Sequence, residues 1–219
     1  MSNEEQLVDW ALSVLEGGDD GSRAALLERH GRDYALEVVL PLSACRKALL
    51  VTKRGWLDVG RTVDEQIPPD VAVLQRYGPL SESHKRLLEQ VIDHLAAPLF
   101  FVGDLDPMDL TTYATLISGN RDASKLSKTK YLGVGDEWIK LCEGDAPGRP
   151  LSVCCIELDT GERRALDRLQ KLAIDWRKVV GKRSMKLLTS GMKLELEGAS
   201  NPAIYTPAFR EKLVSLLFR

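Results

Sequence analysis

Short runs of consecutive apolar residues, each bounded by charged or turn-forming residues, constrain the fold of this sequence most. They occur at 47–52, 70–74, 99–102 and 151–156. Such a run is typical of a strand that is buried on both faces of a parallel sheet. Between them, residues 81–96 repeat apolar residues at the helical period. Because strands alternate with helices, we predict an α/β fold with a mostly parallel, Rossmann-like sheet sandwiched by helices.

The rest of the chain shows mainly helical patterns. We predict helices around 22–30, 108–117 and 162–180, and a last helix from Thr206-Pro207, where the proline suits the first helical position. A capping box, Ser2-x-x-Glu5, opens an amphipathic helix at the N-terminus. We therefore expect an N-terminal helical segment at 1–44, followed by one domain at 45–219.

Composition indicates a cytoplasmic protein. No apolar run approaches the roughly 18 residues that a membrane span requires. The first residues, Met1 to Glu5, are acidic, whereas a signal or transit peptide begins with basic residues. The four cysteines lack the spacing of metal ligands, which favours buried thiols over zinc or disulfides. We expect no membrane partner.

Two aspartates directly follow the run at 99–102, in the segment Gly103-Asp104-Leu105-Asp106-Pro107. Ligands of open α/β sheets gather at the carboxyl ends of strands, and paired carboxylates suit a hard cation such as Mg²⁺. We predict that Asp104 and Asp106 bind Mg²⁺, with Asp109 as a third carboxylate nearby. In the alternative interpretation, Asp104 caps the following helix and Asp106 faces solvent.

Basic residues gather in one segment of a chain whose formal net charge is −2. Between residues 168 and 186 there are seven Lys and Arg residues and a single acid, Asp175. A local surplus of this kind can bind the phosphates of nucleic acid, or it can be an ordinary solvated helix face. The predicted nucleic-acid-binding residues are Lys53, Arg168, Lys171, Arg177, Lys178, Lys182 and Arg183.

Four segments together resemble the Toprim domain of topoisomerase VI A subunits and of their meiotic double-strand-break relatives. They are Phe100 to Pro107 followed by Tyr113; Gln75-Arg76-Tyr77-Gly78-Pro79; Tyr131-Leu132-Gly133-Val134 followed by Trp138; and Ser190 to Ala199, which contains Gly191-x-Lys193-x-Glu195-x-Glu197. The resemblance covers about 45–218, most of the chain. It implies a Toprim-like fold, Mg²⁺ as cofactor and DNA as partner.

Two departures from the family pattern limit the activity that the resemblance implies. The family has a glutamate at the end of its first Toprim strand, where this chain has Thr52. A threonine hydroxyl neither holds Mg²⁺ as a carboxylate does nor shuttles a proton near neutral pH. The family also has an upstream winged-helix domain with a nucleophilic tyrosine, and the residues before 45 are too few for it. We therefore expect no independent strand cleavage, and a protein partner that supplies the missing catalytic or ATPase function.

Three functions stay open at this point. The first is a Mg²⁺-dependent, nucleic-acid-binding Toprim protein within a DNA cleavage, topoisomerase-like or DNA-defence assembly. The second is a catalytically degenerate Toprim scaffold that binds a protein or DNA. The third is an unrelated α/β phosphohydrolase with Asp104 as nucleophile.

Overall fold

A computed structural model describes the chain over residues 24–27, 36–53, 67–76, 80, 82–118, 125–145, 154–196 and 207–218. The chain divides into two compact units. The first comprises Met1–Phe101 and Thr115–Lys130, and the second comprises Val102–Ala114 and Tyr131–Arg219.

The main sheet has six strands in the order β1-β2-β4-β3-β5-β6. Their bounds are Ala24–Leu27 for β1, Leu36–Val39 for β2, Lys47–Val51 for β3, Val71–Arg76 for β4, Leu99–Val102 for β5 and Lys130–Tyr131 for β6. β3 and β4 are parallel, with Lys47 opposite Val71, whereas β2 is antiparallel to both β1 and β4. The predicted α/β class, with a parallel sheet flanked by helices, is confirmed, and two antiparallel strands extend the sheet at one edge.

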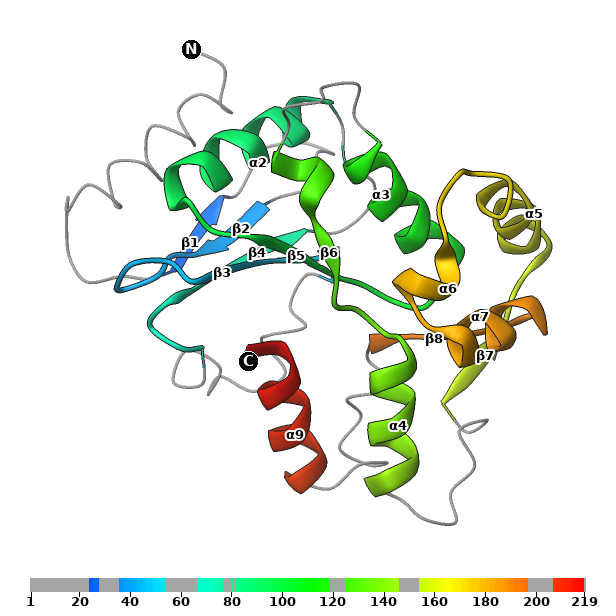
Figure 1. Ribbon diagram of the computed structural model, residues 1–219. Coiled ribbons are helices and arrows are strands. Elements are labelled where there is room, and N and C mark those ends of the chain that lie inside the picture. The colour runs from blue at the N-terminus through cyan, green and yellow to red at the C-terminus, as the bar shows by residue number, and fades with distance from the viewer. Residues whose placement is uncertain are drawn as a thin grey trace. The chain divides into compact units, whose positions relative to one another are not determined.

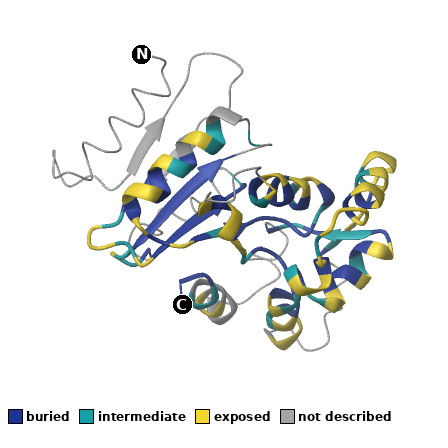
Figure 2. Ribbon diagram, turned by 45° about the horizontal axis from the view of Figure 1, so that its top comes forward, coloured by how far each residue is buried: buried dark blue, intermediate teal, exposed yellow. Residues whose placement is uncertain are grey.

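The core of the first unit lies on β3, β4 and the helix α2 (Glu82–Leu95). Every residue of β3 and β4 is buried, as the continuous apolar runs predict, and these strands are dark blue in Figure 2. The face of α2 that carries Leu88, Val91 and Ile92 is buried as well. Burying a side chain of this size contributes about 1.5–3 kcal/mol, so these elements hold the unit together.

The second unit consists mostly of helices and a small β ribbon (Figure 1). Its elements are α4 (Asp136–Asp145), β7 (Cys155–Glu157), α5 (Thr160–Leu169), α6 (Trp176–Val179), α7 (Lys182–Thr189), β8 (Met192–Leu194) and α9 (Pro207–Phe218), with most of α3 (Pro107–Ile117). β7 and β8 pair antiparallel as a separate two-stranded sheet. α4 contacts both α7 and α9. A 3-10 helix, η1 (Lys125–Lys128), belongs to the first unit.

Three predicted elements differ from the observed ones. The short helix expected around 22–30 is the strand β1 where the structure describes it. The run at 151–156 is described only from Cys154, and its strand β7 is partly exposed and pairs with β8 instead of joining the parallel sheet. The helix expected at 162–180 is broken after Leu169, and α6 forms a separate turn from Trp176. Strand pairing decided the first two outcomes, and a hydrogen bond from the Trp176 indole to the Leu169 carbonyl oxygen accompanies the third.

The remaining predictions concern the N-terminal segment, the cysteines and membrane spans. The helix from the Ser2-x-x-Glu5 box and most of the predicted segment 1–44 lie outside the described residues, so the boundary at 44/45 stays a prediction. All four cysteines are free thiols, and two of them, Cys142 and Cys154, are buried. Among the described helices, none has the length and apolar character needed to cross a membrane.

Candidate metal centre

The aspartate turn lies where β5 ends and α3 begins, as the sequence predicts. Val102 ends the strand, and α3 starts at Pro107. Asp106 precedes this proline, and its carboxylate accepts a hydrogen bond from the backbone N–H of Asp109 (2.7 Å). That is the geometry of an N-cap, with proline at the first helical position. It is therefore Asp106, not Asp104, that caps α3.

Three carboxylates gather at this turn. Asp104, Asp106 and Asp109 each offer one oxygen, and these oxygens lie within 4.8 Å of one another. A hard cation holds its oxygen ligands about 2.0–2.6 Å away, so oxygens on opposite sides of the ion are about 4–5 Å apart. The three carboxylates therefore fit a divalent cation such as Mg²⁺ or Ca²⁺.

Each carboxylate is also held by the backbone. The Asp104 carboxylate accepts from the N–H of Leu196 (2.7 Å), and the Asp109 carboxylate accepts from the N–H of Asp104 (2.6 Å). An ionised carboxylate has about four lone-pair sites, so a carboxylate that accepts a backbone hydrogen bond can also coordinate a cation. The backbone bonds orient the cluster before any ion arrives.

A close approach of two backbone segments supports the turn. A Cβ atom at Gly133 would lie 2.4 Å from the Gly103 carbonyl oxygen and 2.6 Å from its nitrogen, so only glycine fits there. The N–H of Val134 donates to the Gly103 carbonyl oxygen (2.9 Å). The Tyr131 hydroxyl lies 3.0 Å from the Asp104 carbonyl oxygen and can donate to it. The segment after β6 thus fixes the backbone that carries the aspartates.

Tyr131 is a hydrogen-bond donor at this turn and not a nucleophile. Burial and the neighbouring carboxylates, Asp109 first among them, raise the pKa of its hydroxyl well above the ordinary value of 10.0. The phenol is therefore protonated at neutral pH and acts as a hydrogen-bond donor. A nucleophilic role for this tyrosine would require a lowered pKa, so the geometry makes it a positioning residue.

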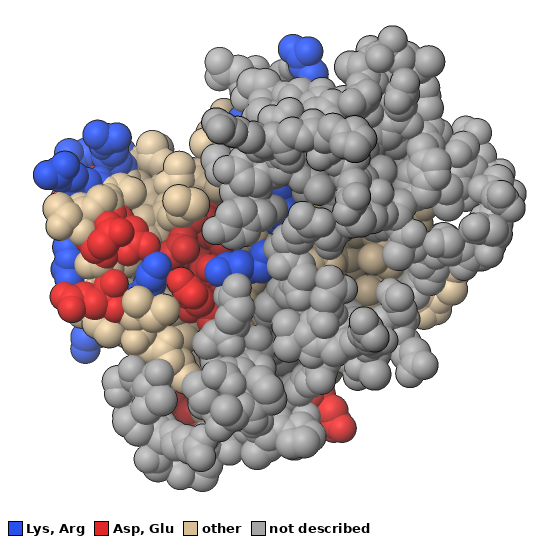
Figure 3. All heavy atoms as spheres, turned by 180° about the vertical axis from the view of Figure 1, so that it is seen from behind, with Lys and Arg blue, Asp and Glu red and all other residues tan. Residues whose placement is uncertain are grey.

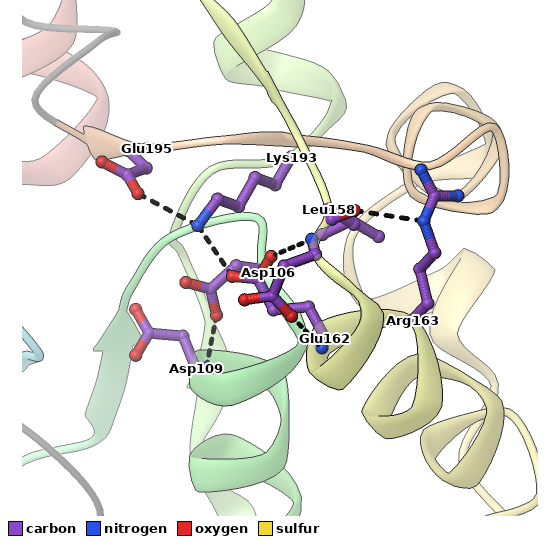
Figure 4. Close-up of polar contacts among 8 residues, drawn as sticks. Asp106, Asp109, Leu158, Glu162, Arg163, Lys193 and Glu195 are labelled. Carbon is purple, nitrogen blue, oxygen red and sulfur yellow. Dashed lines mark hydrogen bonds and ion pairs between the residues drawn. The ribbon is translucent and has the colours of Figure 1, made fainter.

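The strand β8 brings further charges to the aspartate turn. Leu105 pairs with Leu194 through two backbone hydrogen bonds of 2.9 and 3.3 Å. Because successive side chains of a strand alternate, Lys193 and Glu195 both lie on the opposite side from the fully buried Leu194. In Figure 4, Lys193 extends from β8 toward Glu195 and toward Glu162 of α5.

Lys193 is the counter-ion of two glutamates. Its ammonium lies 2.7 Å from Glu162 and 3.3 Å from Glu195, and its side chain is only 14% exposed. Burial lowers the pKa of Lys193, but the two carboxylates outweigh this effect and leave the pKa above its ordinary value of 10.5. Lys193 therefore stays charged and neutralises Glu162 and Glu195. The candidate ligands for a cation are the three aspartates.

The residues that the Toprim resemblance singled out at the first strand belong to the other unit. Thr52 directly follows β3 and is buried, and Lys53 next to it is partly exposed. The aspartates Asp104, Asp106 and Asp109 all belong to the second unit. Thr52 offers a hydroxyl where the family has a carboxylate, so the expected glutamate ligand is not supplied at this position.

The other predicted nucleic-acid-binding residues lie in α5, α6, α7 and the turn between α5 and α6. All six are exposed: Arg168, Lys171, Arg177, Lys178, Lys182 and Arg183. Two of them are paired, Lys178 with Asp175 at 3.5 Å and Arg183 with Glu143. Figure 3 shows acidic side chains gathered in the described part of the rear face, with basic side chains around them. Because Asp175 and Glu143 pair with two of these six cations, the basic segment does not form a uniformly basic face.

Four residues of the site were not assigned a role from the sequence. They are Glu162, Tyr131, Lys193 and Glu195. The signature Asp159-x-x-Glu162 does mark a capping box, which α5 has, but the contact from Glu162 to Lys193 depends on the fold. In Lys193-Leu194-Glu195, charged and apolar residues alternate as they do in a half-buried strand. This pattern could have predicted that Lys193 and Glu195 lie on the same face.

The arrangement can hold one divalent cation at the start of a helix, beside a glutamate–lysine–glutamate cluster. Asp104 is only 2% exposed and accepts a backbone hydrogen bond, which is unfavourable for nucleophilic attack on a phosphate ester. No protein-family model and no curated protein matches the sequence.

Proposed function

We propose that this chain is a Toprim-like, Mg²⁺-dependent nucleic-acid-binding protein of the cytoplasm. It acts as a subunit of a DNA cleavage, topoisomerase-like or DNA-defence assembly, in which a protein partner supplies the missing catalytic or ATPase function. The single observation that carries the proposal is the aspartate cluster, whose three oxygens lie within 4.8 Å of one another at the exit of β5. Carboxylate oxygens in this arrangement are the ligands that Mg²⁺ takes from proteins.

The cation would be held by Asp104, Asp106 and Asp109 and would bring a phosphate group to the turn, because Mg²⁺ keeps open positions for phosphate oxygens. The chain's own residues hold the turn in place and add further contacts to phosphates. Leu196 and Tyr131 hold the turn through the Asp104 carboxylate and the Asp104 carbonyl oxygen. Exposed basic residues of α5 to α7 add contacts to phosphates that do not depend on base sequence.

Titration calorimetry with Mg²⁺ and Mn²⁺ tests this proposal. We expect the wild type to bind one ion per chain, and Asp104→Asn/Asp106→Asn to bind none. Asparagine keeps a carbonyl oxygen for the hydrogen bonds from Leu196 and Asp109, so the turn is preserved while two charges are lost. The matched control is Asp167→Asn, which removes an exposed carboxylate from α5 and should leave ion binding unchanged.

The second candidate is a degenerate Toprim scaffold that binds a protein or DNA without a metal. The specific observation in its favour is that each aspartate already accepts a backbone hydrogen bond and thereby has a structural role. Thr52 at the first-strand position agrees with it. If millimolar Mg²⁺ and Mn²⁺ give no binding heat with folded wild type, the metal proposal is refuted and the scaffold is favoured.

A further inference from the structure

A groove lies in the second unit between the turn that follows α5 and the helix α7. Its volume is about 730 Å³, which is within the range of about 300–1,000 Å³ for small-ligand sites. The lining residues are Gln170, Ile174, Asp175, Trp176, Arg177, Lys182, Met185, Lys186 and Thr189. The sequence predicts no such feature, because it indicates one continuous helix through this segment.

Two contacts shape the groove. One folds the turn after α5, and the other fixes the start of α7. Trp176 is buried, and its indole N–H donates to the Leu169 carbonyl oxygen (2.9 Å), which folds the turn back onto the end of α5. Gly181 has φ +99°, and a Cβ there would lie 2.0 Å from the Asp136 carboxylate carbon. Both walls are therefore held in place without a ligand, which lowers the entropic cost of binding one.

Asp136 makes the second of these contacts rigid. Its carboxylate accepts from the N–H and the hydroxyl of Ser184, both at 2.8 Å, at the first turn of α7. Burial disfavours the charged carboxylate, but the hydrogen bonds from Ser184 and Arg183 outweigh it and hold the pKa of Asp136 below its ordinary value. A carboxylate therefore already occupies the N-terminus of α7, and an anion in the groove must be bound by side chains.

Three cations line the groove. Lys182 and Lys186 lie one turn apart on α7, about 6 Å along the helix axis, and Arg177 faces the groove from α6. Within the described part of the chain, no carboxylate forms an ion pair with any of the three. Elsewhere in the same unit Lys140, Arg163, Lys178, Arg183 and Lys193 are paired. Asp175, the only lining acid, pairs with Lys178, which is outside the lining.

We propose that this groove binds phosphate groups of a nucleic-acid strand through Arg177, Lys182 and Lys186. The identity of the ligand rests on the proposed function, whereas the phosphate chemistry rests on the groove itself. A preformed groove with unpaired cations and an apolar wall of Ile174 and Met185 suits a phosphate with a sugar or base attached. Grooves of this kind track the backbone of single strands.

Fluorescence anisotropy with a labelled 12-nucleotide oligo-dT tests the proposal over a series of salt concentrations. EDTA is present, so that ions at the aspartate cluster do not contribute. For Lys182→Gln/Lys186→Gln we expect at least a tenfold lower affinity at low salt. The slope of log K against log salt should fall in magnitude by about 1.4, because each lost phosphate contact contributes about 0.7 for a single strand.

The matched control is Arg86→Gln/Lys128→Gln. These two exposed basic residues belong to the first unit, outside the groove and outside the helices α5 to α7 that carry the proposed phosphate contacts, so removing them subtracts the same charge. We expect less than a threefold effect. Equal losses in the two double variants would overturn the proposal, because the binding would then follow overall charge and not the groove. Both pairs are exposed, and unchanged thermal unfolding verifies that the variants are folded.

Competition with ATP identifies the source of the phosphate. If ATP displaces the oligonucleotide weakly, the strand is the ligand. If ATP binds as tightly as the oligonucleotide and loses its affinity in Lys182→Gln/Lys186→Gln, the groove takes phosphate from a free nucleotide. Oligonucleotide binding that is unchanged in this variant refutes the groove and leaves the proposed function standing. A wild type that binds neither ligand refutes the groove and the nucleic-acid part of the proposed function together.

Discussion

Asp106→Asn separates the charge of the aspartate cluster from its hydrogen bonds. Asparagine is as good an N-cap as aspartate, so the bond from the Asp109 N–H should persist and α3 should keep its start. What disappears is the repulsion between Asp106 and its two neighbours. In the absence of divalent ions we therefore expect this substitution to stabilise the protein.

The magnitude follows from the 4.8 Å limit on the separation of the three oxygens. Two unit charges at that distance repel by about 0.9 kcal/mol at the dielectric constant of water, and by about 3.5 kcal/mol at an effective value near 20. Asp106 is partly exposed, so the lower figure applies, and losing two such pairs gains about 2 kcal/mol. The lost negative charge at the helix N-terminus costs about 0.3–1 kcal/mol. The net gain is about 1 kcal/mol, or roughly 2–4 °C in Tm for a chain of this size.

Thermal unfolding in EDTA and in saturating Mg²⁺ measures this prediction. A hundredfold excess of ion over Kd stabilises the wild type by about 2.7 kcal/mol, whereas the variant has lost a ligand. The variant should therefore melt higher in EDTA and lower in Mg²⁺. Asp167→Asn, on an exposed face of α5, should show no such reversal. If the order of the two Tm values is the same in both buffers, the reasoning on repulsion and metal binding is refuted.

Three further predictions concern the frame around the site. Gly133→Ala should destabilise the protein by several kcal/mol in urea unfolding, because its Cβ would overlap the Gly103 backbone, while Gly144→Ala in α4 meets no atom within 4 Å and should be neutral or stabilising. Folding lowers the pKa of Asp136 below its ordinary value of 3.8, so the stability that this carboxylate contributes should be present above pH 3.8 and lost as the pH falls below it. In urea unfolding, the difference in stability between wild type and Asp136→Asn should therefore shrink in acid. Folding raises the pKa of Lys193 above its ordinary value of 10.5, so the stability that this ammonium group contributes should be full below pH 10.5 and lost above it. Lys193→Met should therefore make the stability depend less on pH in the alkaline range. An unchanged pH dependence would contradict the ion pairs of Lys193 with Glu162 and Glu195.

The sequence was most informative where local pattern and burial agree. The runs that became β3, β4 and β5 are continuous and apolar, and each is a strand of the main sheet. The helix α2 follows its apolar period closely. In these segments hydrophobic burial is the dominant contribution to stability, and it can be read from the order of residue types.

The sequence was least informative where a side-chain contact outside the helical pattern decides the local structure. Leu166, Leu169 and Trp176 share a helical period, and all three are buried, yet the helix ends after Leu169. The chain turns there because the Trp176 indole donates to the Leu169 carbonyl oxygen and the chain resumes in α6. A side-chain contact of this kind can outweigh helix propensity, whose differences are below about 1 kcal/mol per residue for ordinary residues.

The candidate site was predictable in its centre and not in its surroundings. Asp104 and Asp106 follow from a strand that ends in paired carboxylates, and Asp109 was named beside them. Glu162 and Lys193 are 31 residues apart in the sequence and meet because β7, which leads into α5, pairs with β8. That pairing is a property of the folded chain, which is why no spacing rule predicts it.

The most direct test of the metal centre is to locate a bound paramagnetic ion in the folded protein. In ¹H–¹⁵N spectra, substoichiometric Mn²⁺ should broaden the backbone amides of Asp104, Asp109 and Leu196 first, and excess Mg²⁺ should restore them. The same titration of Asp104→Asn/Asp106→Asn should broaden none of the three selectively. Broadening that is uniform over the chain, or that is centred on other carboxylates, would contradict a divalent cation at the aspartate cluster.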